Sequence, residues 1–236
     1  MIAAPALFAI PVVVEFIQHV VEHRIGMFEG PQAAAALEQH PARVVMGHLK
    51  SLAITFAWLW IPGYMAAARG AWTARAITKA AWAGFLKVLC FWIVLAVVQA
   101  GAGMAMRDGG AGHWTILIAT LITILISLTI ETLTAPWKTA SVLGDGSVSL
   151  VRSLKLAAPI LLWGLALVFL ATFPLLIVHQ VLNAVMVFAQ SPIAFWGLAL
   201  ADSVLVGWLA VLMAAPSYFI YRRALMRRGE TPLGEP

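Results

Sequence analysis

The sequence predicts an all-α fold: a polytopic transmembrane helical bundle of about six spans with short cytoplasmic amphipathic helices. Of the 236 residues, 62% are hydrophobic and only 11% are charged, and the mean hydropathy is +0.94. A soluble domain carries roughly 25% charged residues to keep its surface hydrated. The apolar runs are continuous rather than alternating with period two, so we expect helices and not a barrel.

Six apolar runs are long enough to be spans. They cover residues 2–21, 49–68, 82–106, 114–136, 157–182 and 193–221, each to within a few positions. The fourth is the best delimited, because Trp114 and Trp137 lie about 34 Å apart on a helix and place one ring at each interface. The first has a polar face and either crosses the membrane or lies in its interface. No stretch outside the runs is long enough for a soluble domain, so we predict a single transmembrane domain over residues 1–236.

The basic residues predict the orientation. Four arginines close the last span: Arg222, Arg223, Arg227 and Arg228. Because cytoplasmic loops are enriched in Lys and Arg, we expect a cytoplasmic C-terminus in a multi-pass protein of a bacterial inner membrane. Counting back, the linkers that carry Arg69 with Arg75, and Arg152 with Lys155, also fall inside. The first long linker falls outside despite Arg43, which departs from the rule.

Two linkers predict short amphipathic helices outside the membrane: the first linker and the one after the fourth span. In the second of these, residues 144–147 (Gly-Asp-Gly-Ser) form a turn and N-cap signal. Val148, Val151 and Leu154 then share one face, and Arg152 and Lys155 lie off it. Such a helix is expected to lie on the cytoplasmic leaflet, with its cations near anionic headgroups.

The fourth span carries a polar stripe. Its members recur at spacings of three and four: Thr120, Thr123, Ser127, Glu131 and Thr134. Ionisable residues within spans are costly and mark either a function or a specific packing partner. The stripe therefore faces protein or water. It either makes hydrogen bonds between helices or lines a proton or ion path.

Asp202 is the most deeply placed ionisable residue of the last span, about 14 Å below the outer interface by helical rise. Ala199, Ser203 and Gly207 form a row of small residues beside it, which lets another helix approach closely. A buried aspartate needs a partner, and Thr123 at a similar depth is the candidate. Asp202 is then either a hydrogen-bonded structural residue or part of a proton or ion relay.

Histidines gather toward the predicted outer side, among them His179 near the end of the fifth span. Residues 19–23 (His-Val-Val-Glu-His) match the pattern of the inverted zinc peptidases, but the large soluble domain of those enzymes has no counterpart here. Glu15, His19 and His23 share one helix face and form a candidate metal site. Unlinked interfacial histidines are the alternative. The patterns assign no catalytic residue, and we predict no cofactor.

One region resembles a known family. Its residues are Ala135-Pro136-Trp137, the turn Gly144-Asp145-Gly146, and residues 150–156 (Leu-Val-Arg-Ser-Leu-Lys-Leu). This pattern, within residues 131–170, resembles an element of the six-helix membrane domain of some bacterial glycerophosphodiester phosphodiesterases and of its stand-alone inner-membrane relatives. The resemblance implies six spans with cytoplasmic termini. It implies no catalysis, because the phosphodiesterase chemistry belongs to a separate soluble domain.

These observations predict a non-catalytic scaffold or accessory subunit of an inner-membrane assembly. The alternative is a small transporter or channel-like protein with a proton or ion path along Glu131, Asp202 and the Thr/Ser stripe. A third is an intramembrane metal site at Glu15, His19 and His23. Expected partners are membrane lipid and either another membrane protein or a second copy of the chain. The net charge of +5 follows from topology and does not indicate nucleic acid.

Overall fold

The computed structural model describes residues 3–67, 79–108, 112–189 and 191–233. Within these ranges the chain forms helices and no strand, which confirms the all-α prediction. Five helical stretches are long and apolar enough to cross a membrane: Pro41–Ala66, Lys79–Gln99, Leu117–Leu143, Leu150–Met186 and Pro192–Met226. The chain is therefore a membrane protein built as a helical bundle.

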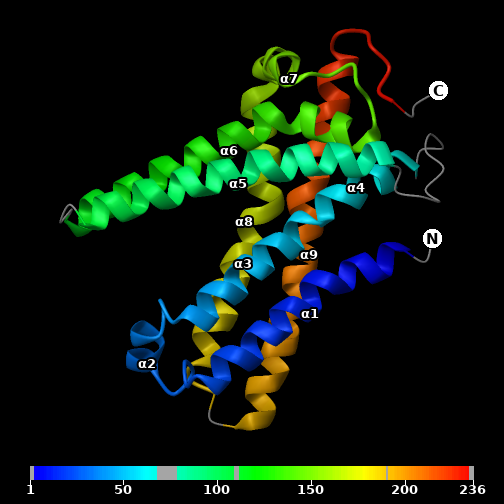
Figure 1. Ribbon diagram of the computed structural model, residues 1–236. Coiled ribbons are helices and arrows are strands. Elements are labelled where there is room, and N and C mark those ends of the chain that lie inside the picture. Colours follow the sequence, from blue (N-terminus) through cyan, green and yellow to red (C-terminus); the bar gives the residue numbers. More distant parts are fainter. Residues whose placement is uncertain (1–2, 68–78, 109–111, 190, 234–236) are drawn as a thin grey trace. The chain divides into compact units, whose positions relative to one another are not determined.

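Figure 1 shows the helices, coloured in chain order. In chain order they are α1 (Ala3–Arg24), α2 (Pro31–Ala36), α3 (Pro41–Thr55), α4 (Ala57–Ala67), α5 (Lys79–Asp108), α6 (His113–Leu143), α7 (Leu150–Ala157), the 3-10 turn η1 (Ala158–Ile160), α8 (Leu161–Met186) and α9 (Pro192–Met226). Helix α1 corresponds to the first predicted span and is not among the five stretches above.

The helices pack into two compact units. Unit 1 comprises Met1–Ile61 and Leu170–Ala215, and unit 2 comprises Pro62–Phe169 and Pro216–Pro236. Helices α8 and α9 each have one part in unit 1 and the other part in unit 2. A single transmembrane domain over the whole chain stays a prediction.

The second span begins at Pro41 and not near Leu49 as predicted. Proline is favoured at the first helical position because its missing N–H has no partner there anyway. His40 caps the helix, and its Nδ1 accepts a hydrogen bond of 3.3 Å from the backbone N–H of Ala42. The amphipathic first linker is therefore short: it holds the single-turn helix α2, and α3 already belongs to the span.

Helices α5 and α6 lie side by side in unit 2 (Figure 1). A Cβ added at Gly84 would lie 1.9 Å from the carbonyl oxygen of Ser141, so the two backbones approach this closely only because residue 84 is glycine. Helix α6 passes the predicted end at Pro136 and stops at Gly144, whose φ of 77° closes the helix in the left-handed conformation. Arg69 and Arg75, used for the predicted topology, lie outside the described residues.

Helix α7 confirms the amphipathic helix predicted after the fourth span, but with a different buried face. Its N-cap is Ser149 rather than Ser147, and the Ser149 hydroxyl accepts a hydrogen bond of 3.2 Å from the N–H of Arg152. This start turns Ser153 and Leu156 inward and leaves Val151 and Leu154 exposed. Of the three apolar residues predicted to share one face, Val148 is buried in the core of unit 2, and Val151 and Leu154 stay exposed.

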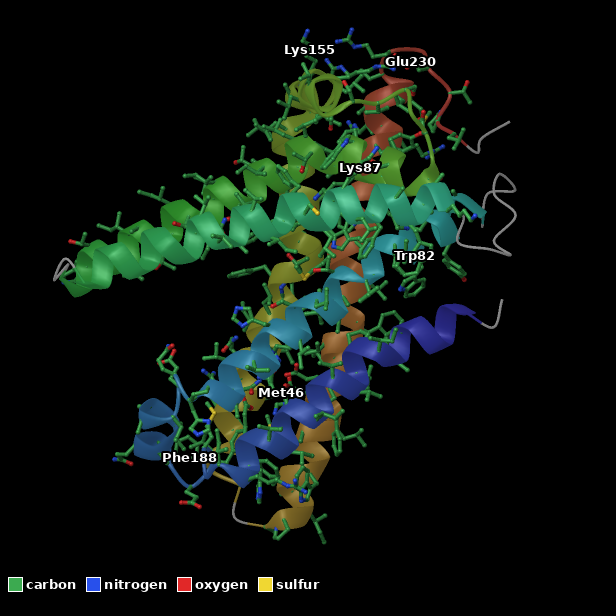
Figure 2. All side chains as sticks on the ribbon, viewed as in Figure 1. Met46, Trp82, Lys87, Lys155, Phe188 and Glu230 are labelled. Carbon is green, nitrogen blue, oxygen red and sulfur yellow. The ribbon has the colours of Figure 1, made fainter. Side chains whose placement is uncertain are left out.

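The chain after α9 is tied back onto unit 2. The Tyr221 hydroxyl donates to Oδ2 of Asp145 over 2.9 Å and accepts from the N–H of Leu233 over 3.1 Å. Arg152 of α7 forms an ion pair with Glu230. In Figure 2, Glu230 lies at the same end of unit 2 as Lys155 of α7.

In unit 1, helix α1 packs along α3 and against α9 (Figure 1). A Cβ added at Gly207 would lie 2.5 Å from Cγ2 of Val12. The ring of Phe8 meets Trp208 edge-on at 5.5 Å. The predicted close approach of a helix to the small-residue row of the last span is thus confirmed, and the approaching helix is α1.

Candidate functional site

Unit 1 contains a group of polar side chains drawn from four helices, which we call the polar cluster. Its members are Glu15, Gln18, His19 and Glu22 of α1, Arg43 and Lys50 of α3, His179 and Asn183 of α8, and Asp202 of α9. Six of them are buried: Glu15, Gln18, His19, Glu22, His179 and Asp202.

Asp202 lies at the centre of the polar cluster and is fully buried. Its Oδ1 is 2.7 Å from Nδ1 of His179, and its Oδ2 is 3.0 Å from Nε2 of His19. Asn183 donates a further hydrogen bond of 3.1 Å to Oδ2. The expectation that Asp202 has polar partners is confirmed. The predicted partner, Thr123, belongs to unit 2, where its hydroxyl donates to the carbonyl oxygen of Ala119.

Glu15 adds a second buried carboxylate beside His19. Its Oε1 lies 3.5 Å from Nε2 of His19, the same nitrogen that faces Asp202. The ammonium of Lys50 lies 3.1 Å from Oε2 of Glu15 and 3.2 Å from Oε1. One imidazole nitrogen therefore stands between two carboxylates, and one of these also contacts a lysine.

Glu22 supplies the third carboxylate, on the other edge of the His19 ring. Its Oε2 lies 3.6 Å from Nδ1 of His19, and its Oε1 accepts from Gln18 at 2.8 Å and from Arg43 at 3.2 Å. Burial alone would raise the pKa of Glu22, but the contacts with His19 and Gln18 and the charge of Arg43 outweigh it and hold that pKa below its usual range.

The polar cluster has an imbalance of permanent charge. Glu15, Glu22 and Asp202 supply three carboxylates, against the two permanent cations Arg43 and Lys50. Buried charges are costly unless they are paired, so one more positive charge is needed, either from a protonated histidine of the cluster or from a bound cation. Chemically, this arrangement suits the binding of a cation.

The structure brings together only two of the three residues of the metal site predicted from the sequence. Glu15 and His19 belong to the polar cluster, but His23 is exposed and its ring packs 4.8 Å from Phe195 and 5.3 Å from Trp196. In place of His23, ligand atoms of His179 and Asp202 lie within 4.8 Å of Glu15 and of each other. The helical spacing that grouped His23 with Glu15 and His19 carries no information about residues of other helices.

The polar stripe of α6 lies in unit 2 and bonds mainly to its own helix. The hydroxyls of Thr123, Ser127 and Thr134 donate to carbonyl oxygens four residues earlier. Ser127 also accepts a hydrogen bond of 2.7 Å from Gln99 of α5, which is the contact between helices expected for such a stripe. Thr120 is exposed.

Glu131 makes an ion pair with Lys138, which lies about two turns further along the same face of α6. Lys138 is fully buried, and its ammonium lies 5.0 Å from the centre of the Trp92 ring. The Ser217 hydroxyl lies 3.5 Å from Oε1 of Glu131, the oxygen that also contacts Lys138. Sequence reasoning singled out Glu131 without this partner, although a lysine seven residues later on the same helix was a visible signal.

The fold and the polar cluster together define the class: an all-α membrane protein with a buried carboxylate–histidine site. No family model matches the chain, and comparisons with curated proteins and with solved structures give no match. The resemblance to the membrane domain of glycerophosphodiester phosphodiesterases therefore stays a prediction.

Proposed function

We propose that the chain is a small multi-pass transporter or channel-like protein of a bacterial inner membrane, with a cytoplasmic C-terminus. In this proposal the polar cluster of unit 1 binds the transported cation. The observation that carries it is the environment of Asp202, a fully buried carboxylate in contact with histidines from two other helices.

The polar cluster favours transport over a purely structural scaffold. Replacing a buried ion network by packed apolar side chains is often neutral or stabilising, so a scaffold has no need of three buried carboxylates in one place. Ionisable residues within a membrane bundle commonly mark an ion or substrate pathway. A membrane-protein partner or a second copy of the chain remains compatible with this role, and lipid is the surrounding solvent.

The sign of the charge favours a cation as the ligand. Carboxylates outnumber permanent cations in the polar cluster, and the carboxylates of Glu15 and Asp202 converge on one point near Nε2 of His19. An anion entering there would meet two like charges in a poorly solvated site, which is strongly unfavourable.

Glu131 and the Thr/Ser stripe are left out of the proposed site. The carboxylate of Glu131 is engaged by buried Lys138, and the stripe hydroxyls of Thr123, Ser127 and Thr134 are engaged by backbone carbonyls. These contacts fit a packing role within unit 2.

Transport is tested with the purified full chain in lipid vesicles. The vesicles hold fluorescent indicators for protons or for divalent metal ions, and a membrane potential drives influx. We expect wild-type vesicles to take up at least one cation, and Asp202→Asn to lower the initial rate at least tenfold. Glu38→Gln, which neutralises an exposed acid of unit 1, is the matched control and should transport normally.

Two results would contradict the proposal. One is the absence of flux for every cation tested, together with stable co-purification of another membrane protein, which is the outcome expected of a scaffold. The other is an unchanged rate in Asp202→Asn, with folding of the variant verified by circular dichroism and gel filtration.

A further inference from the structure

We infer that the polar cluster binds one divalent transition-metal ion through Glu15, His19, His179 and Asp202. The inference deepens the proposed function, on which it rests, by naming the class of cation. Binding is measurable without transport, so the two can fail separately.

The donor atoms already lie close together. Ligand atoms of Glu15, His179 and Asp202 all lie within 4.8 Å of one another. Nε2 of His19 is 3.0 Å from Asp202 and 3.5 Å from Glu15. Ligands bound to one Zn²⁺ at about 2.0–2.2 Å in a tetrahedral site lie about 3.3–3.6 Å apart. The distances from Nε2 of His19 to Glu15 and to Asp202 are already close to this spacing.

The kinds of donor favour a transition metal over other cations. Two imidazoles and two carboxylates suit Zn²⁺, Mn²⁺, Fe²⁺ or Co²⁺, whereas Ca²⁺ and Mg²⁺ prefer oxygen ligands alone. A metal ion would use both histidines, Glu15 and Asp202 at once.

A second observation concerns the polar side chains that contact the proposed ligands and hold their orientation. The Nε2 edge of His19 faces Glu15 and Asp202, while Nδ1, fully buried and without a hydrogen bond, lies 3.6 Å from the carboxylate of Glu22. Metal-binding histidines usually direct their second nitrogen at such a carboxylate, which fixes the ring orientation. Asn183 holds Asp202 in a comparable way and also lies 3.2 Å from the ring nitrogen of His179.

Lys50 acts as a competitor for the metal ion. Its ammonium occupies the Glu15 carboxylate, but its side chain is 20% exposed and so has access to solvent. When Lys50 turns outward, the two charges of a divalent ion balance those of Glu15 and Asp202. Removing the ammonium should therefore strengthen metal binding, an effect of opposite sign to that of losing a ligand.

A pocket in the same unit lies beside Phe28, whose ring is near that of His19. It has a volume of about 220 Å³ and is lined in part by His23, Phe28 and Glu29. The Phe28 ring lies 6.3 Å from the ring of His19. His23 lines this pocket and is not among the proposed ligands.

The test is metal binding to the full chain, purified in mild detergent without a histidine tag and stripped with chelator. Zn²⁺ binding is followed by calorimetry and elemental analysis, and Co²⁺ binding by its visible absorption. We expect one ion per chain and a Co²⁺ spectrum of nitrogen and oxygen ligation. His179→Gln and Asp202→Asn should weaken binding at least tenfold, and Glu22→Gln about tenfold.

Two variants separate this site from the one expected from helical spacing alone. His23→Gln should bind Zn²⁺ like the wild type, and Lys50→Met should bind it several-fold more tightly. Absence of Zn²⁺ and Co²⁺ binding by the folded wild-type chain would overturn the inference, as would binding lost in His23→Gln but kept in His179→Gln. Metal binding without flux would leave the inference standing and refute transport, whereas flux of protons alone without metal binding would do the reverse.

Discussion

Nε2 of His19 lies 3.0 Å from Oδ2 of Asp202, although 183 positions separate the two residues in the chain. Neither atom is exposed to solvent. The contact joins the first helix to the last within unit 1, and the polar cluster is assembled around it. We therefore expect this contact to contribute strongly to the free energy of unfolding of unit 1.

Replacing Asp202 by alanine should destabilise unit 1 by about 3–5 kcal/mol, because it leaves two histidines and Asn183 without the buried carboxylate they share. Asp202→Asn keeps the shape and part of the hydrogen bonding, so its loss should be smaller. Unfolding in detergent, followed by circular dichroism against temperature, measures both. Equal stability of the alanine variant and the wild type would show that the cluster is not structurally coupled.

The helical architecture was predictable because lipid leaves few choices to the backbone. The last span, predicted at residues 193–221, is Pro192–Met226 in the structure. Errors arose where local capping, and not hydropathy, sets the boundary. Helix α3 starts at Pro41 under the cap of His40, and α6 continues through Pro136 to Gly144. In both cases the helix passes through residues that a hydropathy profile assigns to linkers.

The candidate site was predictable only residue by residue. Asp202 was singled out as a costly group within a span, Glu15 and His19 as part of a metal site with helical spacing, and His179 as one of the histidines toward the outer side. Their common grouping did not follow from the sequence. Depth along a span suggested Thr123 for Asp202, since a depth estimate does not say which helices are neighbours. The i, i+4 spacing of His179 and Asn183 places both side chains on one helix face and is a sequence signal for the partner they share.

The buried ion pair of Glu131 and Lys138 should be a strong local determinant of stability in unit 2. Glu131→Gln leaves the ammonium of Lys138 fully buried without its counter-charge, which typically costs about 3–5 kcal/mol. The double variant Glu131→Gln/Lys138→Met removes both charges and should recover most of the loss. Thermal unfolding of the four proteins forms a double-mutant cycle. Strictly additive losses would mean that the pair is not coupled.

The anchor of the C-terminal segment on Tyr221 should control its exposure to protease. Tyr221→Phe removes the hydroxyl that joins Asp145 to the N–H of Leu233, a change of about 1 kcal/mol per hydrogen bond. We expect faster tryptic cleavage after Arg227 and Arg228, measured by mass spectrometry over a time course. Glu230→Gln breaks the ion pair with Arg152 and should accelerate cleavage further in the double variant. An unchanged time course in both would rule out the anchor.

The glycine at position 207 should determine how closely α1 docks on α9. A Cβ at this position would lie 2.5 Å from Cγ2 of Val12 and 3.0 Å from the ring of Phe8, so Gly207→Ala forces these side chains to move. Overpacking of this kind typically costs about 1–3 kcal/mol. Because α1 carries Glu15 and His19, the variant should also weaken binding of Zn²⁺ by the polar cluster.

The matched control is Gly197→Ala on the same helix, where a Cβ would meet nothing within 4 Å. Alanine is a better helix former than glycine, so this variant should be neutral or more stable by up to about 1 kcal/mol. Val12→Ala removes the methyl groups that clash and should restore the stability of Gly207→Ala. Docking and site geometry are followed together by thermal unfolding and Zn²⁺ calorimetry of Gly207→Ala, Gly197→Ala, Val12→Ala and the double variant Val12→Ala/Gly207→Ala. If Gly207→Ala behaves like Gly197→Ala in both measurements, the close contact of α1 with α9 does not position the site.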